Sequence, residues 1–245
     1  MKPLAPDALA DVTGIDPAAV QAAPVVHSVY VYEAPVRAWH WINALAILVL
    51  CVSGYFIGSP LPSMPGEASD HYTMGYIRFA HFAAGQVMAV GLLGRAYWAC
   101  VGNHHAHELF TLPLFRKEYW REVRAMLAWY AFLRPRPNQY VGHNPMARLA
   151  MFFGFLWMSV FMIATGFALY GEGAQEGHLT HTLFTSWVIP LFGGNSQTVH
   201  TWHHLGMWAM VIFVTLHVYA AIREDIMGRQ SMVSTMISGR RTFKN

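Results

Sequence analysis

Long apolar runs separate shorter polar segments along this chain. Four runs of 21 to 23 residues contain almost no charge, and they cover residues 38–58, 79–101, 149–171 and 202–222. A helix of this length, rising about 1.5 Å per residue, crosses a hydrocarbon core of about 30 Å. A single run of this kind also suits a buried helix of a soluble protein. Four of them predict an all-α integral membrane protein built as a four-transmembrane-helix bundle.

Two further segments are helical in pattern but are not expected to cross the membrane. Residues 119–133 mix basic and aromatic side chains at helical spacing, which suits a helix lying in the cytoplasmic membrane interface. Residues 183–191 are too short to span and contain Pro190. We expect this second segment to lie along the outer surface.

The composition agrees with a membrane protein. Of the 245 residues, 55% are hydrophobic and 12% are charged, whereas soluble domains carry about 25% charged residues. The two cysteines, Cys51 and Cys100, fall inside predicted spans and form no Cys-x-x-Cys-His motif. This pattern excludes covalent c-type haem attachment and indicates a packing role for both.

The first 26 residues differ from the rest of the chain. They hold one Lys, three Asp and scattered Pro, without the continuous apolar stretch of a signal peptide. We expect residues 1–26 to form a flexible cytoplasmic tail and residues 27–245 to form a single membrane domain.

Lys and Arg are distributed unevenly between the linking segments. Residues 59–78 hold one and residues 172–201 none, whereas residues 102–148 hold seven and residues 223–245 hold five. Because basic segments stay on the cytoplasmic side, both termini and the middle segment are predicted to be cytoplasmic. In a bacterial inner membrane, the two segments poor in Lys and Arg would face the periplasm.

Histidines carry the candidate chemistry, because ionisable side chains inside membrane spans usually mark function. The sequence has 14, of which five fall in or at the ends of apolar runs: His40, His81, His203, His204 and His217. His203 and His217 are 14 residues apart, so they share one helix face about 21 Å apart along the axis. His204 lies about 140° around the helix from His217 and is expected to contact a neighbouring helix, lipid headgroups or a cofactor carboxylate.

The four remaining histidines sort by depth into two pairs. His81 and His203 lie near the outer ends of their spans, and His40 and His217 lie near the inner ends. Haem iron in a helical bundle is held by one imidazole from each of two facing helices. The sequence therefore predicts two haems, an outer one bound by His81 and His203 and an inner one bound by His40 and His217.

Other residues leave alternatives open. Gly54, Gly58, Gly85, Gly91 and Gly94 either permit close helix packing or make room for a porphyrin face. Arg37, Arg78 and Arg95, near span ends, either bind haem propionates or reach lipid headgroups.

For His104, His105 and His107, a solvated loop is a simpler interpretation than a metal site. His178, His181 and His200 are expected outside, where they would face a partner protein. No phosphate loop, dinucleotide fingerprint, nucleophile elbow or HExxH helix is present, and no nucleic-acid partner is expected.

Several stretches, in this order and spacing, resemble one known family. They are YVYEAPVRAWHWINAL (30–45), MGYIRFAHF (74–82), GRAYWACVGNHH (94–105), GHNP (142–145), TGFALYGEGAQ (165–175), HTWHHLGMW (200–208) and HVYAAIREDIMGRQSMVSTMISGRRTF (217–243). The chain is similar over residues 27–245 to the b-type cytochrome subunit of membrane-bound nickel–iron hydrogenases. His204 departs from the family pattern.

The resemblance implies a small electron-transfer subunit with no hydrogen-splitting residues of its own. Such a subunit anchors a periplasmic hydrogenase, accepts electrons from its iron–sulfur small subunit, and delivers them to quinone near the inner haem. The partners implied are the small and large hydrogenase subunits, quinone and membrane lipid. The ligands implied are His40, His81, His203 and His217.

Alternatives remain at this stage. A second interpretation is that the chain is the cytochrome b of another periplasmic dehydrogenase, such as one for formate, with a similar fold and similar haem ligands but a different partner. A third interpretation is a membrane transporter or metal-handling protein that uses histidines inside the membrane. The quinone site is not assigned: Arg223, Glu224, Asp225 and the loop histidines lie at the inner end, and the acidic residues are by default charges at headgroup level.

Overall fold

A computed structural model describes residues 27–62, 65–67, 71–174 and 177–243. The predicted tail, residues 1–26, lies outside the described part. Four long helical segments are apolar and long enough to cross a membrane: Ala34–Gly58, Thr73–Val101, Pro145–Glu172 and Ser196–Met227. Each extends beyond the predicted run, because polar helical turns continue past the apolar core at one or both ends. The prediction of a four-helix membrane bundle is confirmed.

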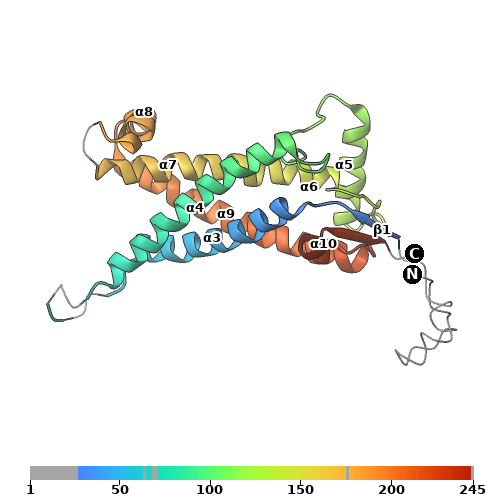
Figure 1. The fold of residues 1–245 in the computed structure, drawn as a ribbon, viewed down its shortest axis with the longest axis horizontal. Helices are drawn as coiled ribbons and strands as arrows, with labels where there is room; N and C mark the ends of the chain where they lie inside the picture. The colour runs from blue at the N-terminus through green and yellow to red at the C-terminus, as the bar shows by residue number, and fades with distance from the viewer. Residues whose placement is uncertain (1–26, 63–64, 68–70, 175–176, 244–245) are drawn as a thin grey trace, which may run out of the picture.

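The spanning segments form two helical hairpins that cross each other (Figure 1). Helix α3 (Ala34–Gly58) packs along α4 (Thr73–Val101). The third span is continuous through α6 (Pro145–Leu149), η2 (Ala150–Trp157) and α7 (Met158–Glu172), and α7 packs against α9 (Ser196–Met227). Helix α4 also contacts α7, and α3 also contacts α9, which closes the bundle.

The centre of the bundle is a small apolar core. All four spans contribute buried members, and Leu109 comes from the segment after α4: Ile47, Met88, Leu109, Phe155, Leu156 and Met210. Many large apolar side chains point outward instead, among them Leu45 at 64% exposed and Leu93 at 73% exposed. In a membrane these outward side chains contact lipid, which is as apolar as they are.

The short elements gather at the two ends of the bundle. At one end lie η3 (His181–Thr185) and α8 (Ser186–Leu191), which contains Pro190 next to its last residue. At the other end α5 (Lys117–Tyr130) runs across the bundle direction, as a helix lying in the membrane plane would (Figure 1). Helix α10 (Met232–Ser238) lies at this same end, against α9 and α3.

A small sheet was not predicted. Strand β1 (His27–Tyr30) pairs antiparallel with β2 (Arg240–Phe243), with His27 opposite Phe243 and Tyr30 opposite Arg240. The carbonyl of Gly239 also accepts from the backbone N–H groups of Val31 and Tyr32. This pairing joins the two ends of the membrane domain on one side of the bundle.

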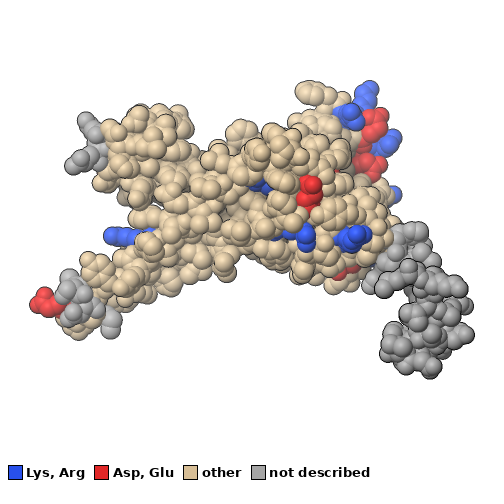
Figure 2. All heavy atoms as spheres, in the orientation of Figure 1, with Lys and Arg blue, Asp and Glu red and all other residues tan. Residues whose placement is uncertain are grey.

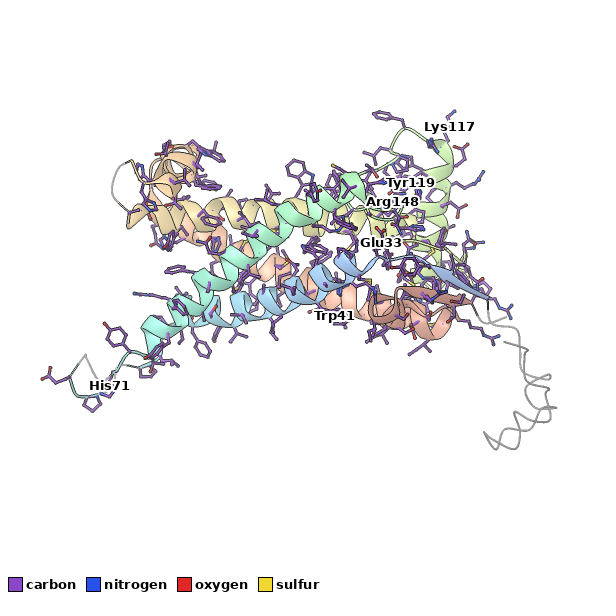
Figure 3. The ribbon with its side chains drawn as sticks, viewed as in Figure 1. Glu33, Trp41, His71, Lys117, Tyr119 and Arg148 are labelled. Atoms are coloured by element: carbon purple, nitrogen blue, oxygen red, sulfur yellow. The ribbon has the colours of Figure 1, made fainter. Side chains whose placement is uncertain are left out.

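Side-chain hydrogen bonds fasten this end of the bundle together. Glu33 accepts from Trp98 Nε1 (3.0 Å) and from the Asn103 backbone N–H (2.8 Å), which joins the start of α3 to the end of α4. Trp41 donates to the Met236 carbonyl (3.0 Å), which ties α3 to α10. Figure 3 shows Glu33, Trp41, Tyr119 and Arg148 on this side and His71 at the far end of the molecule.

Candidate functional site: two histidine pairs

The pair predicted to be the outer one, His81 and His203, joins α4 to α9. The imidazoles of His81 and His203 face each other with ring centroids 6.3 Å apart. Both rings line a cavity of about 850 Å³ between the two helical hairpins, within the size range of cofactor pockets. Figure 2 shows a hollow between the two arms of the molecule at its left, the end that carries α8.

Glycines let these imidazoles approach the neighbouring helices. A Cβ atom on Gly54 would lie 3.2 Å from Cε1 of His81, and one on Gly166 would lie 3.2 Å from Cε1 of His203. Gly85 also lines the cavity, and a Cβ there would meet no described atom within 4 Å. Each interpretation of the glycines therefore has an example: Gly54 permits close helix packing, and Gly85 leaves space beside the histidines.

The second pair joins α3 to α9. His40 and His217 also have ring centroids 6.3 Å apart, and Phe213 stacks on His217 at 5.8 Å. His217 follows His203 by 14 residues in the unbroken helix α9, which places the two pairs about 21 Å apart along that helix. The sequence predicts the same two pairs from the same four histidines.

The spacing of both pairs suits a metal held between two imidazoles. A metal–imidazole nitrogen bond is about 2 Å, so two such bonds plus the distance from each nitrogen to its ring centre give roughly 6 Å between centroids. Both pairs match this separation. The donor set, two neutral imidazoles from facing helices, is one that haem iron accepts.

His204 does not share this geometry. Its ring lies against α3, where a Cβ on Gly58 would be 3.0 Å from it, and its Nε2 accepts a hydrogen bond from Trp208 Nε1 (3.1 Å). Of the contacts predicted for His204, the structure shows the one to a neighbouring helix.

The three arginines near span ends have different surroundings. Arg37 donates to the Ile237 carbonyl in α10. Arg78 is exposed and lines the cavity of the outer pair. Arg95 is 4% exposed and lies over the rings of Trp39 and Phe110, each 5.5 Å from the guanidinium carbon. Because Arg95 is buried, it does not reach lipid headgroups.

Unpartnered donors lie together where α4 packs against the first part of α3, which also carries His40. Within the described residues, Nε and Nη1 of Arg95 and Nε1 of Trp39, whose ring lies 5.5 Å from the Arg95 guanidinium carbon, are buried without a hydrogen-bond partner. Leaving such groups unpaired is costly, above all for a charged one. These donors fit a group that brings carboxylate oxygens, as the propionates of haem do.

The loop of His104, His105 and His107 is solvated only in part: His104 is exposed, whereas His105 and His107 are half-buried. Glu108 is 6% exposed and accepts from Nδ1 of His105 (2.7 Å) and of His143 (3.0 Å), and Ala106 is fully buried. Burial alone would raise the pKa of Glu108, but the hydrogen bonds from both histidines outweigh it and hold the pKa well below its usual value. The His143 ring also contacts the hydroxyl of Tyr32 (3.1 Å).

Glu224 is likewise buried in the protein, whereas the sequence predicts a charge exposed to lipid headgroups, so that prediction is wrong for the exposure of this residue. It is 3% exposed, and its Oε1 accepts from the Tyr130 hydroxyl (2.5 Å) and from Nδ2 of Asn144. The neighbouring Arg223 donates to the carbonyls of Trp129 and Tyr130 at the end of α5 (3.1 Å each). The last residues of α5 therefore contact this part of α9 through hydrogen bonds, which the apolar pattern of α9 alone does not reveal.

Four apolar helices that bring histidines together in pairs at two levels define a class of protein, the membrane-bound b-type cytochromes. Residues 31–239 match the family model described as prokaryotic cytochrome b561, and the chain belongs to that family.

Its relatives carry more specific names. The chain is 64% identical over 239 residues to the "Probable Ni/Fe-hydrogenase B-type cytochrome subunit" of Cupriavidus necator, covering 98% of this chain and 97% of the relative. It is 62% identical over 218 residues to the protein of the same name in Azotobacter vinelandii, covering 89% and 90%. It is 52% identical over 224 residues to the "Probable Ni/Fe-hydrogenase 1 B-type cytochrome subunit" of Escherichia coli K12, covering 89% and 93%.

As a member of this family the chain is a multi-pass membrane cytochrome of the electron-transport type, and a b-type cytochrome contains haem b. The family resemblance noted from the sequence motifs is confirmed.

Proposed function

We propose that this chain is a di-haem b cytochrome that anchors a periplasmic nickel–iron hydrogenase and carries its electrons across a bacterial inner membrane to quinone. The relatives' names support the hydrogenase as partner. The observation that carries the proposal is the equal 6.3 Å spacing of two histidine pairs at two levels of one bundle.

The four histidines would be the axial ligands. His81 and His203 would hold the outer haem, and His40 and His217 the inner one. Haem iron supplies one-electron chemistry by cycling between the ferric and ferrous states. The chain contributes the ligands, keeps the two sites at fixed depths, and excludes water from the space between them with the apolar core around Phe155 and Met210.

Two arginines would bind the haem propionates. Arg78 lines the cavity of the outer pair, and Arg95 presents unpartnered guanidinium nitrogens beside Trp39, which precedes His40. A carboxylate is the natural partner of a buried guanidinium, because the pair forms charge-assisted hydrogen bonds.

The proposed orientation follows from charge. Lys and Arg gather at the end of the bundle formed by α5 and α10 (Figure 2). Since basic groups stay inside, this end would face the cytoplasm, with both termini, and the end with α8 would face the periplasm and the hydrogenase small subunit. The outer pair, near the α8 end, is then where electrons would enter.

The overall reaction takes place at two separate sites. The hydrogenase oxidises hydrogen to two protons and two electrons, and quinone takes up two electrons and two protons to form quinol. This chain would not split hydrogen, so no catalytic residue for that step is assigned to it. The quinone head would bind near the inner pair, at the end where Tyr130, Asn144 and Glu224 form a buried polar group.

Purification of the chain with its partners tests the proposal. We expect a nickel–iron enzyme to co-purify, and hydrogen gas to reduce b-type haem in the complex. Oxidation of that haem on adding quinone should follow. A complex with a different dehydrogenase, or a haem that hydrogen does not reduce, would contradict the proposed route.

A further inference from the structure

Two buried hydroxyl groups contact the outer histidines from the opposite sides of the bundle. Oγ of Ser53, on α3, lies 2.9 Å from Nδ1 of His81, on α4. Oγ1 of Thr165, on α7, lies 2.8 Å from Nδ1 of His203, on α9. Ser53 is 6% exposed and Thr165 is 1% exposed. Each spanning helix therefore supplies either a histidine of the outer pair or the hydroxyl behind one.

The direction of these hydrogen bonds follows from a second contact of each hydroxyl. Ser53 Oγ lies 2.5 Å from the carbonyl of Val49, and Thr165 Oγ1 lies 2.8 Å from the carbonyl of Phe161. A carbonyl oxygen has no hydrogen, so the hydroxyl must donate its single hydrogen there. It then accepts from the histidine, whose Nδ1 must carry a hydrogen.

This arrangement selects the tautomer of both rings. A neutral imidazole with hydrogen on Nδ1 keeps its lone pair on Nε2. Metal-binding histidines are commonly held this way by an acceptor behind the other ring nitrogen, which also raises the basicity of the ligand.

The inner pair lacks this support. Nδ1 of His40 is buried without a partner, and neither His40 nor His217 makes a side-chain hydrogen bond to any residue in the described ranges. The two pairs have the same ring separation but different surroundings at Nδ1.

A buried hydroxyl is not by itself a sign of this role. Ser159 lies on α7, six residues before Thr165, and is also 1% exposed, yet its Oγ has no hydrogen-bond partner in the described part of the chain. Ser159 therefore provides a matched control for Thr165 on the same helix.

We propose that Ser53 and Thr165 are positioning residues that hold His81 and His203 with hydrogen on Nδ1 and thereby lower the reduction potential of the outer haem. A more basic imidazole donates more charge to iron and favours its ferric form, and second-shell hydrogen bonding is one of the protein's means of setting haem potential. The contribution is absent at the inner pair, so it makes transfer from outer to inner haem more downhill. This inference rests on the proposed function.

The test is a redox titration of the purified hydrogenase complex, followed by haem absorbance, with electron paramagnetic resonance of the ferric haems. The variants are Ser53→Ala, Thr165→Val, Thr165→Ser and Ser159→Ala. We expect Ser53→Ala and Thr165→Val each to raise the midpoint potential of one haem and to move that haem's ferric signal. The other haem should be unchanged. Thr165→Ser, which keeps the hydroxyl, and Ser159→Ala should behave as the parent.

Each other outcome has a definite meaning. Two haems per chain with unshifted potentials in Ser53→Ala and Thr165→Val would overturn the inference and leave the proposed function intact. Loss of one haem from Thr165→Val but not from Thr165→Ser would support the role of the hydroxyl. Loss from Thr165→Ser as well would show that side-chain packing matters instead, and would overturn the inference. A parent protein without haem would overturn the proposed function itself.

Discussion

Nε1 of Trp208 donates a hydrogen bond to Nε2 of His204, one turn earlier on α9, at 3.1 Å. The lone pair that would bind iron is therefore engaged in His204. In the adjacent His203, Nδ1 is hydrogen-bonded to Thr165, and the ring faces His81 across the cavity.

The two neighbouring histidines should consequently differ on replacement. We expect His203→Ala to lose one of two haems and to block electron entry, and His204→Ala to keep both. Haem content and the reduced-minus-oxidised spectrum measure the difference. Loss of haem from His204→Ala alone would reverse the assignment.

Replacing Arg95 should change the inner haem. A buried cation beside a haem favours the less positive ferrous state, so we expect Arg95→Met to lower the midpoint potential of one haem. Redox titration measures the shift. Arg121→Met removes the same charge from a side chain that is 70% exposed and serves as the control. Equal potentials in parent and Arg95→Met would rule out the proposed contact with a propionate.

The buried Glu108 predicts a pH-dependent stability. Its pKa is held below the usual value of about 4.3 by His105 and His143, so its contribution is full above that value and is lost as pH falls through the lower folded-state pKa. We expect Glu108→Gln to lower the apparent melting temperature in detergent at pH 7, because the hydrogen bonds to a charged group are worth about 1.5–3 kcal/mol each.

The difference between parent and Glu108→Gln should shrink in acid, below about pH 4. Glu122→Gln is a comparison on a carboxylate that is more exposed than Glu108, at 32% of its side chain, and should change stability less, although hydrogen bonds from Tyr140 and Asn138 lower its pKa too. A Glu108→Gln variant as stable as the parent at pH 7 would show that the carboxylate charge does not hold this loop.

The spans and the histidine pairs could be predicted because both depend on local periodicity. Apolar run length fixes a membrane helix, and a separation of 14 residues places His203 and His217 on one face whatever surrounds them. The grouping with His81 and His40 needed only the depth of each residue in its span.

What the sequence did not reveal depends on contacts between distant segments. Strands β1 and β2 lie at opposite ends of the domain's sequence, and each is too short to stand out by alternation. Glu224 contacts Tyr130, at the end of α5, and Asn144, just before α6, and both are far from it in the sequence. Ser53 and Thr165 make the ordinary hydrogen bond to the carbonyl four residues earlier, which gives no sign that a histidine lies behind them. The one available signal was a hydroxyl inside an apolar span.

The most direct test of the account is the ratio of haem to protein in the purified chain, measured by pyridine haemochrome. The account predicts two haem b per chain in the parent, and one after either His81→Ala or His40→Ala, with different haems lost in the two variants. A well-folded parent that binds fewer than one haem per chain, or that is colourless and holds zinc or copper, would contradict it.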